Sequence, residues 1–163
     1  MVIIRDAHQD DLLSILKIYN QAIINTTATF DLTEETLEQR QQWFSKYGSD
    51  YPLIVATIEN KVVGYCCLSA FREKAAYAKT VELSVYVDEN TRGHGVATKL
   101  VNEILQRAKQ MGFHVIISGI TKGNDNSIKL HEKFGFEFIG SFKEVGYKFD
   151  SWQDVLFYQL IID

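Results

Sequence analysis

A glycine-rich segment at residues 92–98, Arg-Gly-His-Gly-Val-Ala-Thr, is the first candidate for chemistry. Alternating apolar residues from Thr80 to Val87 predict a strand before it, and periodic apolar residues from Val96 to Met111 predict a long helix after it. The backbone N–H groups of this segment would therefore lie at the positive N-terminus of a helix, where anions bind. Its two glycines would let the backbone approach a pyrophosphate, and its arginine would add a positive charge.

Two other readings of this segment compete with the anion site. Short glycine patterns also occur in plain strand-to-helix turns. A Rossmann dinucleotide site would need glycine or alanine at position 98, where Thr98 stands, and would belong to a first βαβ unit instead of the middle of the chain. We therefore discount the Rossmann reading and keep the plain turn as the alternative.

The elements around this segment predict a mixed sheet. Strands linked by a hairpin, then a series of strand, helix, strand, helix and strand, imply an α/β (α+β) fold with helices on both faces. The length suits one domain over residues 1–163. Strands are predicted at 2–5, 53–58, 62–70, 80–87, 115–120, 136–142 and 155–161, and helices at 10–24, 33–46, 96–111 and 126–134, with a polar hairpin turn at 59–61.

Composition excludes several classes of partner and site. Seventeen Lys and Arg against 21 Asp and Glu give a net charge of -4 without a basic run, which argues against nucleic acid or an anionic membrane as partner. Cys66 and Cys67 are neighbours in an apolar strand, so they would point to opposite faces and form no disulfide framework. Without a signal-like start or a long apolar run, we expect a cytoplasmic protein that does not span a membrane.

The glycine-rich segment and stretches along nearly the whole chain resemble the GNAT superfamily of N-acetyltransferases, in its phosphinothricin and methionine sulfoximine/sulfone acetyltransferase branch. Arg-x-x-Gly-x-Ala after a strand is similar to the pyrophosphate loop of that superfamily. The resemblance implies a mainly antiparallel sheet of about seven strands, splayed at the acetyl-CoA site, and a homodimer. The other similar stretches are residues 18–20, 26–31, 81–86, 124–127, 130–133 and 142–149.

The resemblance also implies that acetyl-CoA is the acetyl donor and that no metal is required. The strand before the loop would pair with the pantetheine arm, and its backbone donors would polarise the thioester carbonyl. Asn124 would contact the same arm and Lys133 the phosphate end, although a turn or cap residue and a solvated lysine are the alternatives. The implied cofactor-binding residues are Val85, Tyr86, Val87, Arg92, Gly93, His94, Gly95, Val96, Ala97, Thr98, Asn124 and Lys133.

Two residues are candidates for proton transfer. Amide formation needs a neutral amine, so a group must accept a proton from the acceptor's ammonium. We assign this role to Glu82, because burial in its otherwise apolar strand would raise its pKa. His131 stands where many GNAT enzymes have a tyrosine thought to protonate the departing thiolate, which implies a second acid or base. The opposite assignment, with His131 as base and Glu82 orienting the ammonium, stays open, as do structural roles for both residues.

The acceptor implied by the resemblance is a small anionic amino-acid analogue of the phosphinothricin, methionine sulfoximine or methionine sulfone type. Its α-amino group would be acetylated directly within a ternary complex. Arg72 and Lys74 would neutralise its carboxylate and second oxyanion, although basic residues after a strand are commonly just solvated. This stretch departs from the family pattern, with Glu73 among its cations and no proline. The implied acceptor-binding residues are Phe30, Arg72, Lys74, Tyr77 and Tyr86.

Other functions remain as alternatives. A GNAT enzyme could acetylate a peptide N-terminus or a polyamine, although Arg72 and Lys74 disfavour a polycationic acceptor. A non-catalytic acyl-CoA-binding domain would keep the cofactor loop and lose transfer, but Glu82, His131 and Phe30 are all retained together with Tyr77, which argues against this.

Overall fold

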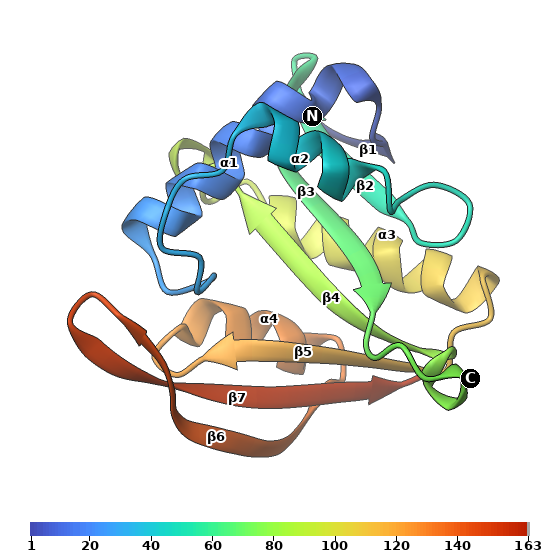
Figure 1. Cartoon of the computed structure of the whole chain (residues 1–163). Coiled ribbons are helices and arrows are strands. Elements are labelled where there is room, and N and C mark those ends of the chain that lie inside the picture. Colours follow the sequence, from blue (N-terminus) through green and yellow to red (C-terminus); the bar gives the residue numbers. More distant parts are fainter. Residues whose placement is uncertain (163) are drawn as a thin grey trace.

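A seven-stranded sheet in the order β1-β2-β3-β4-β5-β7-β6 runs through the computed structural model, which describes residues 1–162 (Figure 1). Within these residues β4 and β5 are parallel and the other neighbours are antiparallel, which confirms the predicted mixed, mainly antiparallel sheet. The strands are β1 (Val2–Asp6), β2 (Leu53–Ile58), β3 (Lys61–Ala70), β4 (Thr80–Val87), β5 (Val115–Thr121), β6 (Glu137–Lys148) and β7 (Ser151–Ile161).

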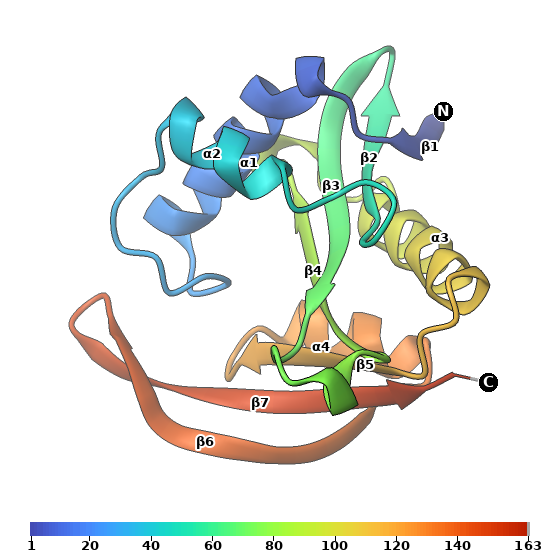
Figure 2. The same ribbon diagram turned by 45° about the vertical axis from the view of Figure 1, so that its right-hand side comes forward.

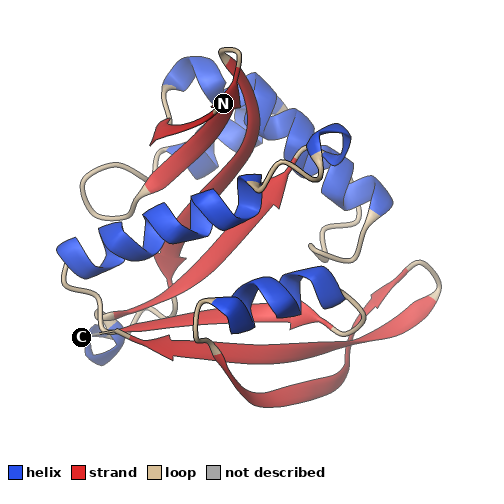
Figure 3. Ribbon diagram, turned by 180° about the vertical axis from the view of Figure 1, so that it is seen from behind, coloured by secondary structure: helices blue, strands red, loops and turns tan. Residues whose placement is uncertain are grey.

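Helices cover both faces of the sheet (Figures 2 and 3). Helices α1 (Leu12–Asn25) and α2 (Leu37–Phe44) lie on one face, and α3 (Val96–Gln110) and α4 (Asp125–Lys133) lie on the other. Each face of the sheet has its own hydrophobic core, and the central strand β3 contributes side chains to both. Cys66 packs on the α3 side and Cys67 on the α1 side. The two free thiols therefore point to opposite faces, as predicted. None of the described helices combines the length and apolar character that crossing a bilayer requires.

The sheet splits between β4 and β5. Thr80, Val81 and Glu82 are paired with β5, and beyond Glu82 the two strands diverge (Figure 1). From Leu83 to Val87, β4 keeps its pairing with β3, while no described strand pairs with its other side. Backbone groups on this open side of β4 are therefore available to a ligand. The predicted splay of the sheet is confirmed, and we call this branching point the fork.

The second helix is shorter than the predicted range 33–46. The Thr36 side chain accepts a hydrogen bond from the Gln39 backbone N–H, and the Thr36 N–H donates to Gln39 Oε1 at 2.9 Å. This reciprocal capping box fixes the start of α2 at Leu37. The residues before it belong to the connection from α1.

The two closing strands are longer than the predicted ranges 136–142 and 155–161. They continue to a two-residue turn at Phe149 and Asp150, whose φ angles are 54° and 57°. A register shift between Phe142 and Gly146, with Glu144 at φ 53°, breaks the alternation that identifies a strand in sequence. The hairpin turn between β2 and β3 matches its prediction, with positive φ at Glu59 and Asn60.

Candidate active site at the fork of the sheet

A cavity of 510 Å³ opens at the fork, bounded by the open side of β4 and by α1, α3 and α4. This volume lies in the range of small-molecule sites. All of the predicted cofactor residues except His94 line the cavity: Val85, Tyr86, Val87, Arg92, Gly93, Gly95, Val96, Ala97, Thr98, Asn124 and Lys133. The structure thus brings together residues that lie far apart in the sequence.

The glycine-rich segment forms one end of the cavity. Gly93 has a φ of 88° and Gly95 a φ of 70°, and Gly95 is the N-cap of α3. No side chain caps this helix start, so its first N–H groups are free to bind an anion. A Cβ on either glycine would meet no protein atom within 4 Å, so the left-handed backbone is the structural reason for glycine. Free N–H donors beside Arg92 fit a pyrophosphate.

Helix α4 forms a second wall through one of its faces. The four residues Asn126, Lys129, Leu130 and Lys133 follow the spacing of a single helical face and all line the cavity. Asn124 caps this helix, because its Oδ1 accepts a hydrogen bond from the Ser127 N–H at 3.3 Å. It also lines the cavity, so the capping and binding readings of Asn124 are compatible.

Helix α1 forms the third wall and is tied to the turn that precedes the loop. The Glu89 N–H donates to Gln21 Oε1 at 3.2 Å, and Asn25 Nδ2 donates to the Glu89 carboxylate at 3.0 Å. Gln21 and Glu89 both line the cavity. The second bond fixes the position of the Glu89 carboxylate against α1.

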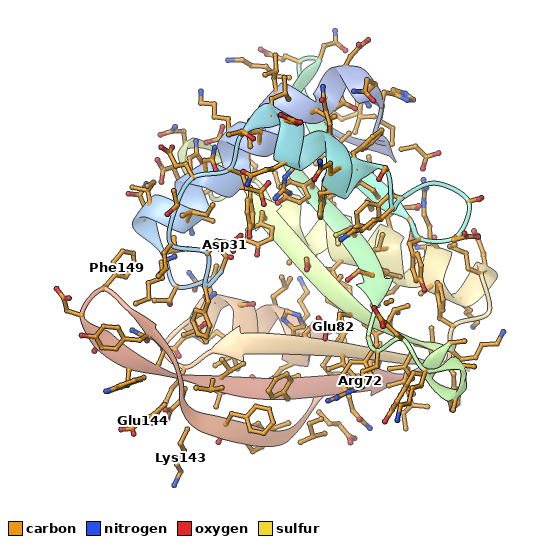
Figure 4. The ribbon with its side chains drawn as sticks, viewed as in Figure 1. Asp31, Arg72, Glu82, Lys143, Glu144 and Phe149 are labelled. Atoms are coloured by element: carbon orange, nitrogen blue, oxygen red, sulfur yellow. The ribbon has the colours of Figure 1, made fainter. Side chains whose placement is uncertain are left out.

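Glu82 lies at the fork, as the last residue of β4 that pairs with β5. Its side chain reaches solvent. Partial burial nevertheless raises the pKa of its carboxyl group above the ordinary value, and the positive charge of Arg72 opposes the shift. Figure 4 shows both side chains in the region where β3 and β4 approach β5. A carboxylate with a raised pKa beside an open strand edge is suited to accept a proton.

His131 lies inside the protein, and it is not among the residues that line the cavity. Its Nδ1 donates to the Ser127 carbonyl oxygen at 2.7 Å, and its Nε2 accepts from the Ser118 hydroxyl at 2.9 Å. Burial lowers the pKa of the imidazole, which favours its neutral form. Both ring nitrogens are thus engaged: the bond to Ser118 joins α4 to β5, and the bond to Ser127 lies within α4. The sequence suggested a direct proton donor or acceptor.

The predicted acceptor residues are divided between the two ends of the fork. Tyr86 lines the cavity, and burial raises the pKa of its phenol well above the ordinary value. Arg72 lies over the ring of Phe71 at 4.7 Å and 6.0 Å from the ring of Tyr77, in the loop after β3. Lys74 is exposed in the same loop.

Phe30 belongs to the other end, in the connection between α1 and α2. Its ring covers the backbone of Gly146 so closely that a Cβ there would overlap it. Phe30 and Arg72 are not members of the cavity lining, and neither are Lys74 and Tyr77.

Several lining residues were not predicted from the sequence. The helical spacing of the α4 face is a local signal that could have found three of them. The approach of α1 to the loop could not be predicted from helical spacing, because Gln21 and Glu89 are 68 residues apart in the sequence. The additional lining residues are Ile18, Gln21, Ala22, Thr26, Ala28, Glu89, Thr91, Asn126, Ser127, Lys129 and Leu130.

Comparisons with known proteins agree with this geometry. The acetyltransferase (GNAT) domain family matches residues 4–157. The chain is 41% identical over 162 residues to the L-methionine sulfoximine/L-methionine sulfone acetyltransferase of Pseudomonas aeruginosa, over 98% of this chain and 94% of that enzyme. Two crystal structures are similar. One is the ribosomal-protein-alanine N-acetyltransferase of Brucella melitensis (TM-score 0.95, 43% identity, 98% of this chain and 99% of that one). The other is a phosphinothricin acetyltransferase of Sinorhizobium meliloti in complex with acetyl-CoA (TM-score 0.94, 36% identity, 99% of this chain and 88% of that one).

Proposed function

Because this chain belongs to the GNAT acetyltransferases, we propose that it transfers an acetyl group from acetyl-CoA to the α-amino group of a small anionic amino-acid analogue. One observation carries the proposal: the open side of β4 begins beyond Glu82, at the fork, and runs to the cavity and the anion-binding loop at 92–98. Glu82 itself is not among the residues that line the cavity. A donor, an acceptor amine and a base can be brought together there, which suits direct transfer in a ternary complex.

Acetyl-CoA would supply an acetyl group already activated as a thioester. The loop at 92–98 would bind its pyrophosphate, since the start of α3 has uncapped N–H donors and Arg92 lies beside them. The unpaired edge of β4 at Val85–Val87 would bind the amide-containing arm, with Asn124 and Lys133 on the opposite wall. Backbone donors held in this way can stabilise charge that develops on a carbonyl oxygen.

Glu82 would act as the base. It lies at the fork, its pKa is raised by partial burial, and it reaches solvent, so a proton can pass to it directly or through a water. We assign His131 a supporting role instead, because its Nδ1 is bonded to the Ser127 carbonyl within α4 and its Nε2 to Ser118, which holds α4 against β5. This assignment leaves the thiolate to be protonated by another group or by solvent.

The class of acceptor is suggested by Arg72 and by the named substrates of the relatives. Arg72 has aromatic rings on one side and acts electrostatically on Glu82, so an anionic group beside it would place an amine near the base. Methionine sulfoximine, methionine sulfone and phosphinothricin share such anionic or strongly polar oxygens, and they name the activities of two relatives. The alternative is the N-terminal alanine of a protein, suggested by the Brucella melitensis structure.

Two further properties belong to the proposal. We infer a homodimer, because exposed apolar side chains gather on β6 and β7, including Phe138, Phe142 and Trp152. We also infer a cytoplasmic location, since the adjacent thiols of Cys66 and Cys67 are both free and the relatives are bacterial enzymes of small molecules.

A thiol-release assay with acetyl-CoA tests the function. The acceptors are methionine sulfoximine, methionine sulfone, phosphinothricin, a peptide that begins with alanine, and spermidine. We expect the anionic analogues to be acetylated most efficiently and the Arg72→Gln variant to lose this preference. Faster acetylation of the alanine peptide would favour the second candidate, and binding of acetyl-CoA without turnover of any amine would indicate a non-catalytic domain.

A further inference from the structure

The connection between α1 and α2 crosses from one half of the split sheet to the other. We call residues 26–31 of this connection the strap. Thr26 and Ala28 line the cavity, and Phe30 follows two residues later. Figures 1 and 2 show the strap descending from α1 toward the β6–β7 hairpin. It therefore lies across one end of the fork.

We call β1–β4 the near half of the sheet and β5–β7 the far half. On the near half, the strap is hydrogen-bonded to side chains of α1 and β4. The Tyr19 hydroxyl is hydrogen-bonded to Thr29 Oγ1 at 2.9 Å and also donates to the carboxylate of Asp31. The Tyr86 hydroxyl donates a longer bond, of 3.4 Å, to the Ala28 carbonyl oxygen. The rings of Tyr19 and Tyr86 meet edge to face at 5.4 Å, so both anchors belong to one packed unit.

On the far half, the strap is tied to β5 and β6. The Thr121 hydroxyl donates to the Thr27 carbonyl oxygen at 2.7 Å, and Lys148 Nζ donates to the Thr29 carbonyl oxygen at 2.8 Å. The ring of Phe30 covers the backbone of Gly146, two residues from Lys148. Side chains of the far half thus donate hydrogen bonds to the carbonyl groups of Thr27 and Thr29, two alternate residues of the strap.

These far-side ties matter because the two halves share little else along the sheet. Within residues 1–162, β4 pairs with β5 only through Thr80, Val81 and Glu82, at the closed end of the fork. The distance between the halves at the open end therefore depends on contacts outside the sheet. Lys148 is the charged contact in this set, and its side chain is only 4% exposed although lysine is costly to bury.

We propose that Lys148 is a positioning residue for the acceptor amine: its ammonium holds the Thr29 carbonyl and thereby fixes Phe30, one of the predicted acceptor-binding residues, at the open end of the fork, opposite the end where Arg72 and Glu82 lie. This inference rests on the acetyltransferase function proposed above. Asp31, two residues after Thr29 in the strap, adds a favourable charge interaction with the same ammonium. Lys148 itself does not touch the reacting atoms, and it acts through the strap.

Steady-state kinetics of Lys148→Met and Lys148→Arg test this role. Methionine keeps the buried stem and removes the charge-assisted bond, so we expect the KM for the acceptor to rise about tenfold. The KM for acetyl-CoA should rise less than that for the acceptor, because the loop at 92–98 and the open side of β4 belong to the near half of the sheet and, of the predicted cofactor-binding residues, only Asn124 and Lys133 to the far half. Arginine should restore part of the loss. Lys143→Met, an exposed lysine on the same strand (Figure 4), is the matched control.

Hydrogen exchange gives a readout that needs no activity. In Lys148→Met the amides of residues 27–31 should exchange faster than in the wild type, and in Lys143→Met they should not. Thermal unfolding would confirm that each variant is folded. Unchanged exchange and an unchanged acceptor KM would overturn the proposal, as would equal rises in both KM values. If the wild type acetylates no amine, the proposed function fails, while the exchange experiment still reports whether Lys148 orders the strap.

Discussion

At the scale of single residues, Glu82 connects the electrostatics of the fork to the proposed chemistry. Its pKa is raised by partial burial, so the carboxylate needed as a base is lost at a higher pH than for an exposed glutamate. We expect kcat/KM to fall on the acid side through an apparent pKa above the ordinary value of a glutamate. Glu82→Gln should lower kcat by about a hundredfold or more and remove this limb.

The control for this prediction is Glu38→Gln, which changes an exposed glutamate at the start of α2. It should leave the profile unchanged. A Glu82→Gln variant that kept both its rate and its acid limb would show that another group accepts the proton. Substitution of Arg72 by Gln should move the limb to higher pH, because the charge that lowers the pKa of Glu82 would be gone.

His131 leads to a prediction about stability. Burial lowers its pKa in the folded protein, so the unfolded chain takes up a proton first as the pH falls. The free energy of unfolding should therefore decline as the pH drops below about 6.5, the pKa of a histidine in the unfolded chain. Above that pH, His131 should add no pH dependence to the free energy of unfolding. His131→Asn should be less stable at pH 8 and show a flatter decline.

Melting temperatures measured between pH 5 and pH 8 would test this prediction. The matched control is His114→Asn, in the connection before β5. The same slope in wild type and His131→Asn would contradict the assignment of a buried neutral imidazole. A wild-type activity profile that follows the titration of His131 would argue that it takes part in proton transfer after all.

At the scale of elements, sequence reasoning succeeds where the signals are local. The apolar period of α3 is strong and Gly112, at φ 82°, ends it as expected, so its bounds are predicted almost completely. The start of α2 was missed because Thr33, three residues before Thr36, is also a possible N-cap in a stretch with few apolar residues, and the capping box of Thr36 and Gln39 selects the later start. The middle of β6 was missed because its bulge interrupts the alternation.

The candidate site follows the same division. The glycine-rich loop and its helix are adjacent in sequence, so their anion-binding role could be inferred directly. The α1 wall and the far-side ties of the strap could not, because Thr121 and Thr27 are 94 residues apart and Lys148 and Thr29 are 119 apart. The burial of His131 could not be predicted either, since it results from tertiary packing of α4 on β5, where the Ser118 hydroxyl binds the imidazole.

The start of α3 yields a prediction about cofactor binding. Gly95 has a left-handed backbone, so Gly95→Ala should destabilise the loop by about 1–2 kcal/mol and raise the KM for acetyl-CoA more than that for the acceptor. Gly112→Ala is a control with a similar backbone cost at the opposite end of α3. Calorimetric titration with CoA would separate the two effects. Equal losses of CoA affinity in both variants would indicate a general loss of stability and no specific role of the loop.

At the scale of the whole molecule, the split sheet produces both the site and an unpaired edge. The fork separates β1–β4 from β5–β7, and the order of the sheet leaves β6 at the outer edge of the second part. β6 is long and mostly exposed, with apolar side chains such as Phe142 and Val145 in contact with solvent. An exposed apolar edge strand is prone to associate unless it is covered.

We therefore expect this edge and the adjoining hairpin to form the interface of the proposed homodimer. Trp152 is 61% exposed and its ring packs on that of Tyr147 at 4.8 Å with a tilt of 60°, so a change there should affect association more than folding. A buried aromatic at an interface can contribute about 2 kcal/mol or more, and an unpaired carboxylate in its place adds a desolvation cost. Trp152→Glu should thus be monomeric at micromolar concentration, where the wild type is dimeric.

Sedimentation velocity, supported by thermal unfolding, would measure this change. Leu13→Glu is the matched control, because Leu13 is 66% exposed on α1, away from β6. It should leave the dimer intact. A monomeric wild type would remove the proposed assembly, and a dimeric Trp152→Glu would place the interface elsewhere. If the monomer retained full acetyltransferase activity, the fork of one chain would suffice for catalysis, and covering the β6 edge would serve solubility alone.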